Sequence, residues 1–402
     1  MRASELQESR QKRYLFVIKN VEFVYSHFFP MVEAIQSAGW EVWIVADCNC
    51  SAERLISEGM HVIHVPAPSG FWNFVGEFRA LLQRYRAMRR VRPDIAHFVT
   101  LKIALPCGLA ARVARVPAVL FAITGMGTLF TVNRPIYRAL RPMFLSALRI
   151  ATRHPNAVLA TENDDDRRFL IERGIVAAAR TSVIPGAGVS RESAPANPSE
   201  NTMPIILCAA RMIQQKGIRT LIEAARILYR REIPFMLWLA GDVDSDYPMS
   251  LSVNELRRAE AELPLRWLGH RSDVVALLQQ CSVFCLPTYY REGLPRVLVE
   301  ACAAARPIVT TSVPGCRDIV RNGENGALVP PRDAVALANS LECLLLDCEL
   351  CRRMGTAARR IFEEQFSVEH VLAALNKCFL ALGEPLTVRS CATAPPAVEE
   401  VT

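Results

Sequence analysis

Short apolar runs alternate with longer segments of helical periodicity along almost the whole chain. One series occupies the first half and consists of YLFVIKN, EVWIVA, HVIHVPA, IAHFVT, AVLFAIT and AVLAT. A second series begins after about residue 200 and consists of PIILCAA, FMLWLAG, RWLGH, VFCLPT and PIVTT. Strands that alternate with helices form parallel sheets, so each series predicts one doubly wound, Rossmann-like α/β domain.

A linker is predicted between the two series. Residues 186–204 contain few large apolar side chains and many Gly, Pro, Ser and Asn residues. We therefore expect a first domain at residues 1–190 and a second at residues 200–365, facing a central cleft. Ligands of open parallel sheets bind beyond the carboxyl ends of the strands, so binding residues are expected in the loops that follow the apolar runs.

The composition argues against several classes of protein. No run approaches the roughly 20 uninterrupted apolar residues of a membrane-spanning helix. The polar start, MRASELQESRQKR, lacks the apolar segment of a secretory signal, which predicts a cytoplasmic protein. The 13 cysteines are scattered through apolar stretches, as expected for reduced core residues rather than a structural zinc site. Residues 385–402 are predicted to be a disordered tail.

Charge is distributed unevenly between the two halves. Residues 1–190 contain 24 Lys and Arg against 15 Asp and Glu, whereas the rest of the chain contains 23 against 25. The basic half predicts an anionic partner, which is a phosphorylated substrate, an acidic membrane surface or nucleic acid. Nucleic acid is disfavoured because the basic segments lack the organised motifs of such proteins.

The first loop argues against a redox cofactor. The segment KNVEFVYSHFFP follows the first predicted strand and contains no glycine. A dinucleotide site needs a Gly-rich turn at that point, so no nicotinamide or flavin cofactor is expected.

Two loops of the second half carry candidate donor-binding residues. In REGLPRVLVE, Pro295 suits the first turn of a helix, which leaves Glu292 in the preceding loop. The free N–H groups from Leu294 to Val297 and the helix dipole would then favour a phosphate, and Glu300 would lie about 7.5 Å further along the helix. In AARMIQQKG, two cations flank a loop at a strand end and could neutralise a diphosphate without a metal: Arg211 and Lys216. Each feature alone also fits ordinary surface charges.

Several motifs in order resemble a known family. RMIQQKG, LAGDV, LGHRSDV and PTYYREGLPRVLVEACAAARPIVTTSVPG are similar to the nucleotide-sugar half of family 4 glycosyltransferases, a retaining group with the GT-B fold. SHFFPMVEAIQSAGWEV and HFVTLKIALPCGLAARVARVPAVLFAITGMGTLF resemble the subgroup that builds capsule, O-antigen or glycan precursors on a lipid diphosphate. The resemblance covers roughly residues 13–380. It implies that a helix at residues 366–384 crosses back to the first domain.

The resemblance also implies roles for individual residues. Arg211 and Lys216 would bind the donor diphosphate, and Glu292 would hold hydroxyls of the transferred sugar with the backbone of Gly293 and Leu294. Glu300 would bind the ribose. The uracil pocket would be bordered by His270 and Arg271. Departures from the family pattern occur at Ser190, Thr161 and Glu162 and leave the identity of the sugar open.

Candidate acceptor residues follow the strands of the first half. His27 and Lys102 are either contacts for the acceptor or ordinary packing and surface groups, and His97 is also a candidate for assisting the chemistry. Thr124 and Gly125 lie in a loop, AITGMG, where flexible backbone lets a ligand approach closely. The aspartates of GDVDSD, which are Asp242, Asp244 and Asp246, could hold a divalent metal, but a solvated loop is preferred and no metal is expected.

Two basic and aromatic stretches, residues 71–93 and 133–154, predict contact with a membrane. The first places Phe71, Trp72 and Phe74 beside a series of arginines: Arg79, Arg84, Arg86, Arg89 and Arg90. Aromatic side chains that enter the interface and arginines that meet anionic head groups are typical of peripheral membrane surfaces. Ordinary helices with solvated arginines are the alternative.

The leading hypothesis is a hexosyltransferase that moves a sugar, with an N-acetylhexosamine as one candidate, from a UDP-sugar to a lipid-linked acceptor. It would work in the cytoplasm, at the inner face of the cytoplasmic membrane. A sugar-nucleotide epimerase of the same architecture is a competing hypothesis, as is a non-catalytic scaffold that binds a nucleotide sugar or a membrane. Glu292 and Glu300 match a transferase motif, which argues against the epimerase, and a scaffold would be favoured if Arg211, Lys216 or Glu292 were missing.

Overall fold

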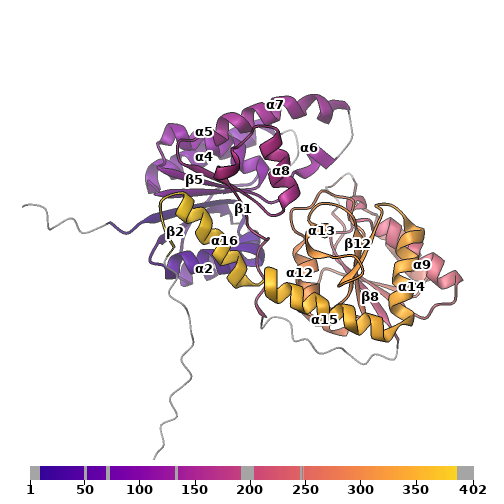
Figure 1. Cartoon of the computed structure of the whole chain (residues 1–402). Helices are drawn as coiled ribbons and strands as arrows, with labels where there is room; N and C mark the ends of the chain where they lie inside the picture. Colours follow the sequence, from indigo (N-terminus) through magenta and orange to yellow (C-terminus); the bar gives the residue numbers. More distant parts are fainter. Residues whose placement is uncertain are drawn as a thin grey trace, which may run out of the picture.

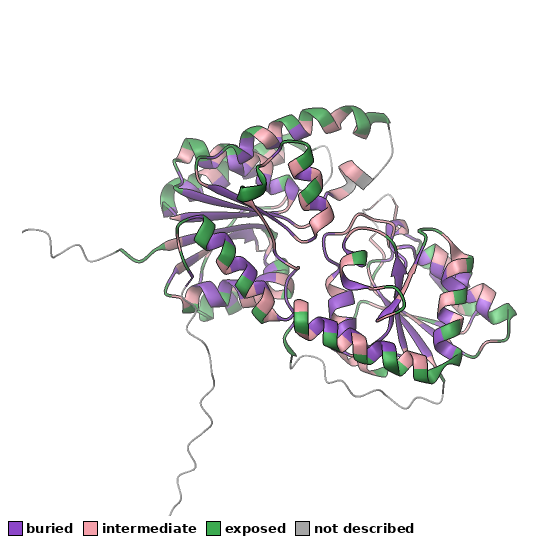
Figure 2. Ribbon diagram, viewed as in Figure 1, coloured by how far each residue is buried: buried purple, intermediate pink, exposed green. Residues whose placement is uncertain are grey.

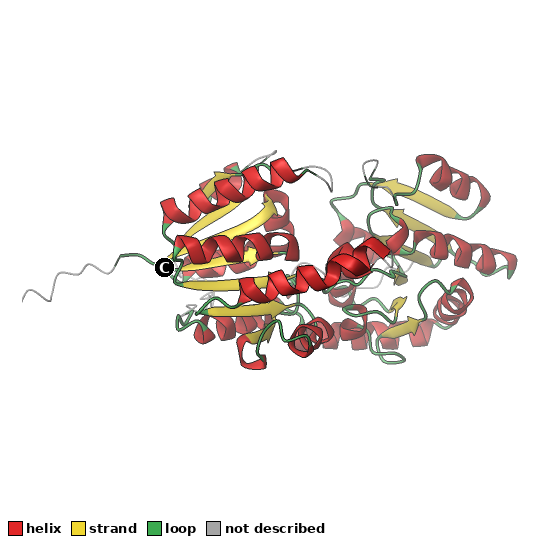
Figure 3. Ribbon diagram, turned by 90° about the horizontal axis from the view of Figure 1, so that it is seen from above, coloured by secondary structure: helices red, strands yellow, loops and turns green. Residues whose placement is uncertain are grey.

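The computed structural model describes residues 10–48, 52–68, 73–131, 135–191, 203–244, 247 and 249–386. It contains two parallel sheets in two halves, each flanked by helices on both faces (Figures 1 and 3). No described helix is long and apolar enough to cross a bilayer. The prediction of two doubly wound α/β halves is confirmed.

The first half has a seven-stranded sheet in the order β3-β2-β1-β4-β5-β6-β7. Its strands are β1 (Arg13–Asn20), β2 (Glu41–Asp47), β3 (His61–His64), β4 (Ile95–Val99), β5 (Ala118–Ile123), β6 (Ala157–Thr161) and β7 (Thr181–Val183). Its helical segments are α1 (Val21–Phe23), a π-helical turn η1 (Val24–Phe28), α2 (Phe29–Ser37), α3 (Glu53–Ser57), α4 (Phe74–Val91), α5 (Leu101–Ala114), α6 (Gly127–Thr131), α7 (Pro135–Thr152), α8 (Asp164–Glu172) and η2 (Ala178–Arg180). Buried side chains of α4, α5 and α7 form one core on one face of the sheet.

The second half has a six-stranded sheet in the order β10-β9-β8-β11-β12-β13. Its strands are β8 (Ile205–Ala209), β9 (Met236–Ala240), β10 (Leu265–Gly269), β11 (Val283–Leu286), β12 (Ile308–Thr311) and β13 (Gly326–Val329). Its helices are η4 (Gln214–Lys216), α9 (Ile218–Arg230), α10 (Val253–Glu262), α11 (Val274–Gln280), α12 (Arg296–Ala303), α13 (Cys316–Ile319), α14 (Ala334–Leu346) and α15 (Cys348–Gln365). One continuous hydrophobic core joins these elements, and Figure 2 shows much of its sheet as buried.

The last helix, α16 (Val368–Ala381), lies against the first sheet, beside α2 (Figure 1). Its Phe379 ring packs 5.7 Å from the ring of Tyr14 and 5.6 Å from that of Trp40, measured between centroids. Leu386, which the sequence analysis placed in the tail, is buried, and its N–H donates to Asn376 Oδ1 at 3.0 Å. Residues 387–402 lie outside the described part of the chain.

The loops at the carboxyl ends of the two sheets meet each other. Asn163, after β6, donates from Nδ2 to the carbonyl oxygen of Gly293 at 2.8 Å. Asp166 in α8 accepts from Arg291 Nε at 2.7 Å, and Asp165 accepts from Arg317 Nη2 at 2.7 Å. These contacts join the halves at the edge where parallel sheets bind ligands.

Candidate functional site

Lys216 and Glu292 form an ion pair at the carboxyl edge of the second sheet. Lys216 ends η4, just after β8, and its Nζ lies 2.5 Å from Glu292 Oε1. Thr288 Oγ1 also donates to Glu292 Oε1, at 3.0 Å. The two side chains of the ion pair are only 18% and 13% exposed, so their geometry is well defined by packing. The sequence analysis placed both residues in one site, and the structure brings them together.

Gly217 holds the Lys216 loop against the neighbouring strand. Its φ is +76°, and a Cβ at this position would lie 2.0 Å from the carbonyl oxygen of Pro287. A side chain there would therefore push the lysine loop away from β11 and from Glu292.

The helix that carries Glu300 begins where the sequence predicts. Pro295 is the N-cap of α12, and Arg296 Nε donates to Glu300 Oε1 at 2.7 Å within the helix. Val297, in the first turn, is partly buried. The helix N-terminus therefore lies directly after Glu292, as an anion site at this edge requires.

The other predicted donor residues are more exposed. Arg211 Nη1 lies 3.4 Å from Asp244 Oδ2, and the Arg211 side chain is 62% exposed. Arg271 Nε donates to Asp273 Oδ1 at 2.7 Å, and His270 is exposed beside it at the end of β10. Arg211 also lies over the Tyr247 ring, 5.9 Å from its centroid, and Arg271 forms two hydrogen bonds with Asp273. Both guanidinium groups are exposed, so they are accessible to a bound anion.

The aspartate loop follows β9. Asp242 is exposed, and the Asp244 carboxylate is paired with Arg211. Asp246 lies outside the described residues. Among the residues that are described, no group of three or more His, Cys, Asp or Glu side chains has the arrangement of a metal site.

His97 lies inside the first sheet rather than in a loop. It belongs to β4, is fully buried, and its Nδ1 is hydrogen-bonded to the hydroxyl of Tyr14. Burial lowers the pKa of His97 to about 3, so the ring is neutral. Its Nε2 has no hydrogen-bond partner within the described part of the chain.

His27 faces the second half of the molecule. It sits in η1, and its ring stacks on that of Phe23 with centroids 4.6 Å apart. Burial and the nearby charge of Arg296 lower the pKa of His27 to about 4. Because Arg296 holds Glu300, His27 lies near the donor residues and not only near the acceptor half.

The remaining acceptor candidates lie in different surroundings. Thr124 lines a cavity, and Gly125 approaches the backbone N of Gly293 across the interface. Lys102, in the first turn of α5, is 64% exposed and pairs with Glu77 of α4. It is not among the residues that line the cavity.

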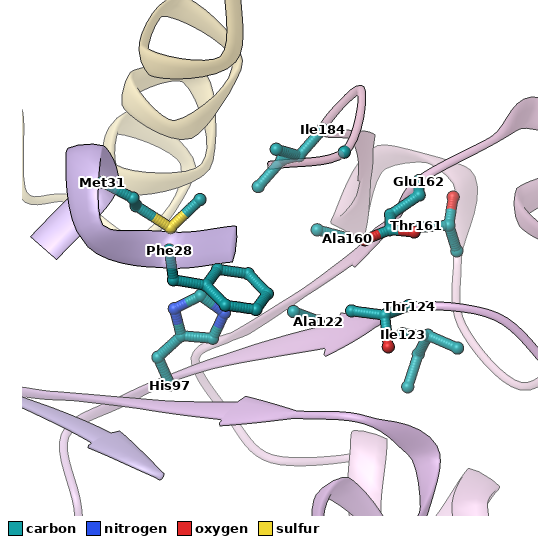
Figure 4. A pocket seen from close by; sticks show the side chains of 11 residues that line it. Phe28, Met31, His97, Ala122, Ile123, Thr124, Ala160, Thr161, Glu162 and Ile184 are labelled. Carbon is teal, nitrogen blue, oxygen red and sulfur yellow. The ribbon is translucent and has the colours of Figure 1, made fainter. Parts of the chain in front are cut away.

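The cavity lies beside His97 and has a volume of about 20 Å³, enough for one water or hydroxyl group (Figure 4). Most of its lining is apolar and includes Phe28, Met31 and Ile184. The polar side chains that line it are His97, Thr124, Thr161 and Glu162. It therefore combines an apolar wall with a few hydrogen-bonding groups, as small-ligand sites do.

Glu162 is a site residue that the sequence analysis noted only as a departure from a pattern. Its Oε2 accepts the backbone N–H of Leu294 at 2.8 Å across the interface, so the expectation that this N–H is free for a phosphate is wrong. Burial, together with the charges of Glu292 and Asp166, raises the pKa of Glu162 to about 8, although the Leu294 N–H opposes the rise. A Cβ on Gly293 would lie 2.0 Å from Glu162 Oε2, so glycine is what permits this approach.

Two protein-family models match the chain. The model described as "Glycosyl transferases group 1" matches residues 189–361, and the "Glycosyl transferase 4-like domain" matches residues 27–187. Together they cover both halves of the chain. The chain belongs to these glycosyltransferases. The family 4 resemblance is confirmed, and the protein is an enzyme of the transferase class.

Relatives and solved structures agree with this assignment. The glycosyltransferase is 23% identical over 340 residues to the N,N'-diacetylbacillosaminyl-diphospho-undecaprenol alpha-1,3-N-acetylgalactosaminyltransferase of Campylobacter jejuni, covering 81% of this chain and 88% of the relative. Sucrose-phosphate synthase from Thermosynechococcus elongatus superimposes with a TM-score of 0.76 at 19% identity, covering 93% of this chain and 99% of the other. Anabaena HepE in complex with UDP and glucose gives 0.70 at 17% identity, covering 92% and 100%. The fold is GT-B.

The glycosyltransferase thus has one charged and one apolar wall. The second half contributes Lys216, Arg211 and the α12 N-terminus, which suit an anionic leaving group. The first half contributes the cavity beside His97, which is too small for a sugar ring but fits a hydroxyl group.

Proposed function

We propose that the enzyme transfers a sugar from a UDP-sugar to a lipid-linked acceptor, with retention of the anomeric configuration. The observation that carries the proposal is the Lys216–Glu292 pair at the N-terminus of α12, with Glu300 further along the same helix. The Campylobacter relative is named for transfer to a diphospho-undecaprenol acceptor, and HepE was solved with UDP. An N-acetylhexosamine is the first candidate for the transferred group.

The site's charges suggest how the leaving group is stabilised. The diphosphate would rest on Lys216, Arg211 and the free N–H groups of α12, so that negative charge developing on it meets fixed positive potential. Glu300 would accept hydrogen bonds from the ribose. Glu292, released from Lys216, would hold hydroxyls of the transferred sugar.

Retention follows if bond breaking and bond making share one face of the sugar. The bond from the anomeric carbon to the diphosphate oxygen breaks, and the acceptor hydroxyl oxygen bonds to that carbon from the same side. The departing phosphate oxygen takes the acceptor's proton. The neutral His97 would orient the acceptor or the sugar through Nε2, the atom left without a partner in the described residues.

The acceptor would be reached from a membrane surface on the first half. The helices α4, α5 and α7 lie side by side over one face of the sheet, and between them they contain one acidic residue, Glu77 (Figure 1). Exposed large apolar side chains gather on these three helices: Phe74, Val75, Phe78, Leu82, Leu109, Val113, Ile136, Met143 and Ile150. Exposed arginines accompany them: Arg79, Arg86, Arg89, Arg90, Arg112 and Arg138. An apolar and basic face is complementary to an anionic bilayer.

The described face does not include three residues of the predicted membrane segment. Arg84 is buried, with 5% of its surface exposed, so the expectation that it meets head groups is wrong. Phe71 and Trp72 lie outside the described residues.

The decisive experiment is a screen of radiolabelled UDP- and GDP-sugars with a membrane lipid extract. We expect label from one UDP-sugar in the organic phase. A new nucleotide sugar in the aqueous phase without any acceptor would instead indicate an epimerase. Binding without turnover of any donor would indicate a scaffold.

Chelation is expected to leave turnover intact. Lys216, Arg211 and the α12 N-terminus supply positive potential at the proposed diphosphate site, so EDTA should not change the rate. The assay compares initial rates with EDTA and with added Mg²⁺ or Mn²⁺. A rate that vanishes in chelator and returns with metal would assign a catalytic role to the loop of Asp242 and Asp244.

Replacing the apolar and basic groups of α4 should release the enzyme from anionic vesicles. The variant carries Phe74→Ser, Phe78→Ser, Arg86→Gln, Arg89→Gln and Arg90→Gln, which removes both the apolar and the electrostatic contributions. High salt should mimic the arginine changes, because screening shortens the reach of surface charge to below about 10 Å above 0.1 M. Co-sedimentation with vesicles measures the effect.

The matched control for vesicle binding changes arginines of the second half. Arg230 and Arg258 lie on α9 and α10 and are 69% and 81% exposed, so Arg230→Gln and Arg258→Gln should leave sedimentation unchanged. UDP affinity should survive in both variants. Equal sedimentation of all proteins at every salt concentration would show that α4 is an ordinary solvated helix.

A further inference from the structure

Glu162 connects the two walls of the active site. Its carboxyl group accepts the Leu294 N–H at 2.8 Å, on the loop proposed to carry the transferred sugar. The same side chain lines the cavity that contains His97 (Figure 4). Glu162 therefore lies between the Glu292–Leu294 loop and the cavity, where it can meet a sugar whose hydroxyl group enters the cavity.

The position of Glu162 is defined by the loop of Gly293 and Leu294 across the interface. Gly293 has no room for a Cβ, which would lie 2.0 Å from Glu162 Oε2 and 2.6 Å from the carbonyl oxygen of Thr124. The next residue, Asn163, donates to the Gly293 carbonyl oxygen at 2.8 Å and is buried. The carboxyl group is thus presented to the sugar site by a rigid loop rather than by a mobile side chain on the surface.

We propose that Glu162 is a specificity-determining contact of the transferred sugar, binding one of its hydroxyl or amide groups opposite Glu292. The inference rests on the proposed function, because it assumes that the sugar of a nucleotide sugar lies on the Glu292–Leu294 loop. It adds a carboxyl group from the first half to a site whose other sugar contacts come from the second.

The protonated acid suits this role better than the carboxylate. Three titratable groups surround Glu162: Glu292, Asp166 and the neutral His97. Glu292 forms an ion pair with Lys216, and Asp166 forms one with Arg291. The pKa of Glu162, raised to about 8, keeps a proton on the carboxyl group at neutral pH. One oxygen then accepts from Leu294 while the O–H donates to the sugar, which is the hydrogen-bonding pattern of a glutamine side chain.

The chain offers a matched pair of variants. Glu162→Gln keeps an acceptor and a donor without a titratable proton, whereas Glu162→Met keeps the length and removes both. The full chain would be titrated calorimetrically with UDP, UDP-glucose, UDP-galactose, UDP-N-acetylglucosamine and UDP-N-acetylgalactosamine. UDP has no transferred sugar, so its affinity reports the remaining donor site and the integrity of the fold.

The variants should differ in sugar affinity and not in UDP affinity. We expect Glu162→Met to weaken binding of the preferred UDP-sugar by about 10-fold, since a hydrogen bond to the sugar is lost. The differences in affinity among the four UDP-sugars should become smaller. UDP affinity should stay within about two-fold, because its contacts lie in the second half. Glu162→Gln should bind the preferred sugar like the wild type at pH 7 and retain that affinity at pH 9, where the wild type has lost its proton and weakens.

Four results would contradict the inference or the proposed function on which it rests. An unchanged ratio of UDP-sugar to UDP affinity in Glu162→Met would remove Glu162 from the sugar site. Tighter UDP-sugar binding in that variant would mean that Glu162 only competes for the Leu294 amide, and an equal loss of UDP affinity would indicate a structural role. Failure of the wild type to bind any UDP-sugar would refute the proposed donor itself. This result is distinguishable from a failure of the inference, because it is seen in the wild type and the others are seen only in the variant.

Discussion

Replacing Lys216 with alanine is expected to lower turnover by about 100-fold or more, because a fixed cation that meets charge on the leaving diphosphate acts mainly in the transition state. The effect on folding should be much smaller, because the Glu292 side chain is partly exposed and water can hydrate its carboxylate when the ammonium group is removed. Initial rates at saturating donor, with thermal unfolding in parallel, measure the two effects separately.

The control for Lys216→Ala is a lysine outside the cleft. Lys377 is exposed on α16, which packs against the first sheet, so Lys377→Ala should leave the rate unchanged. An unchanged rate in Lys216→Ala at saturating donor would contradict the assignment of Lys216 to the diphosphate site.

A methyl group on Gly293 is expected to abolish most of the activity by holding the halves apart. The nearest atoms to the added Cβ would be Glu162 Oε2 at 2.0 Å and the Thr124 carbonyl oxygen at 2.6 Å, and both belong to the first half. Separating the walls by even 1 Å misaligns acceptor and donor, and such a displacement costs roughly 100-fold in rate.

The second half should still fold and bind UDP in Gly293→Ala, because the atoms nearest to the new methyl group lie across the interface. We therefore expect unchanged UDP affinity by calorimetry but reduced turnover in the lipid-extraction assay. A variant with wild-type turnover would mean that the halves work at a separation larger than the one seen in the structure.

The fold was largely readable from the sequence because apolar runs fill whole buried strands. The runs IAHFVT and AVLFAIT contain β4 and β5, in which every residue is buried. The strands β7 and β13 were missed. β7 has three half-buried residues, and β13 has four residues that begin with a glycine, so neither forms a conspicuous apolar run.

The expected donor residues could be placed at one edge of the sheet because they are close in sequence to strand ends and to a helix start. Lys216 follows β8, and Glu292 precedes α12, so parallel-sheet topology brings both to one edge. The first-half residues were harder to place. His97 is expected in a loop near a strand end, but it is a buried residue within β4. It is the one polar residue in an otherwise apolar strand, so its burial was not evident from the sequence.

Glu162 could not have been assigned from local pattern. Its partner, Leu294, is 132 residues further along the chain and belongs to the other half. A glutamate after a strand looks solvated in the sequence, and its environment exists only when Gly293 and Leu294 meet it across the interface. The π-helical turn that carries His27 gave no signal either, since it differs from an α-helix by a single inserted residue.

The path of the chain between the halves bears on how such enzymes can be recombined. The backbone passes from first to second half after Val189 and returns between α15 and α16, where Ser367 is fully buried and forms a β-bridge with Val189. α16 belongs to the core of the first half through Phe379, although it comes last in the chain. A chimera that exchanges the donor half for that of a relative must therefore have two junctions, one in the linker and one at Phe366–Ser367. A single crossover would pair the first sheet with a foreign α16 and leave Tyr14 and Trp40 against side chains they do not fit.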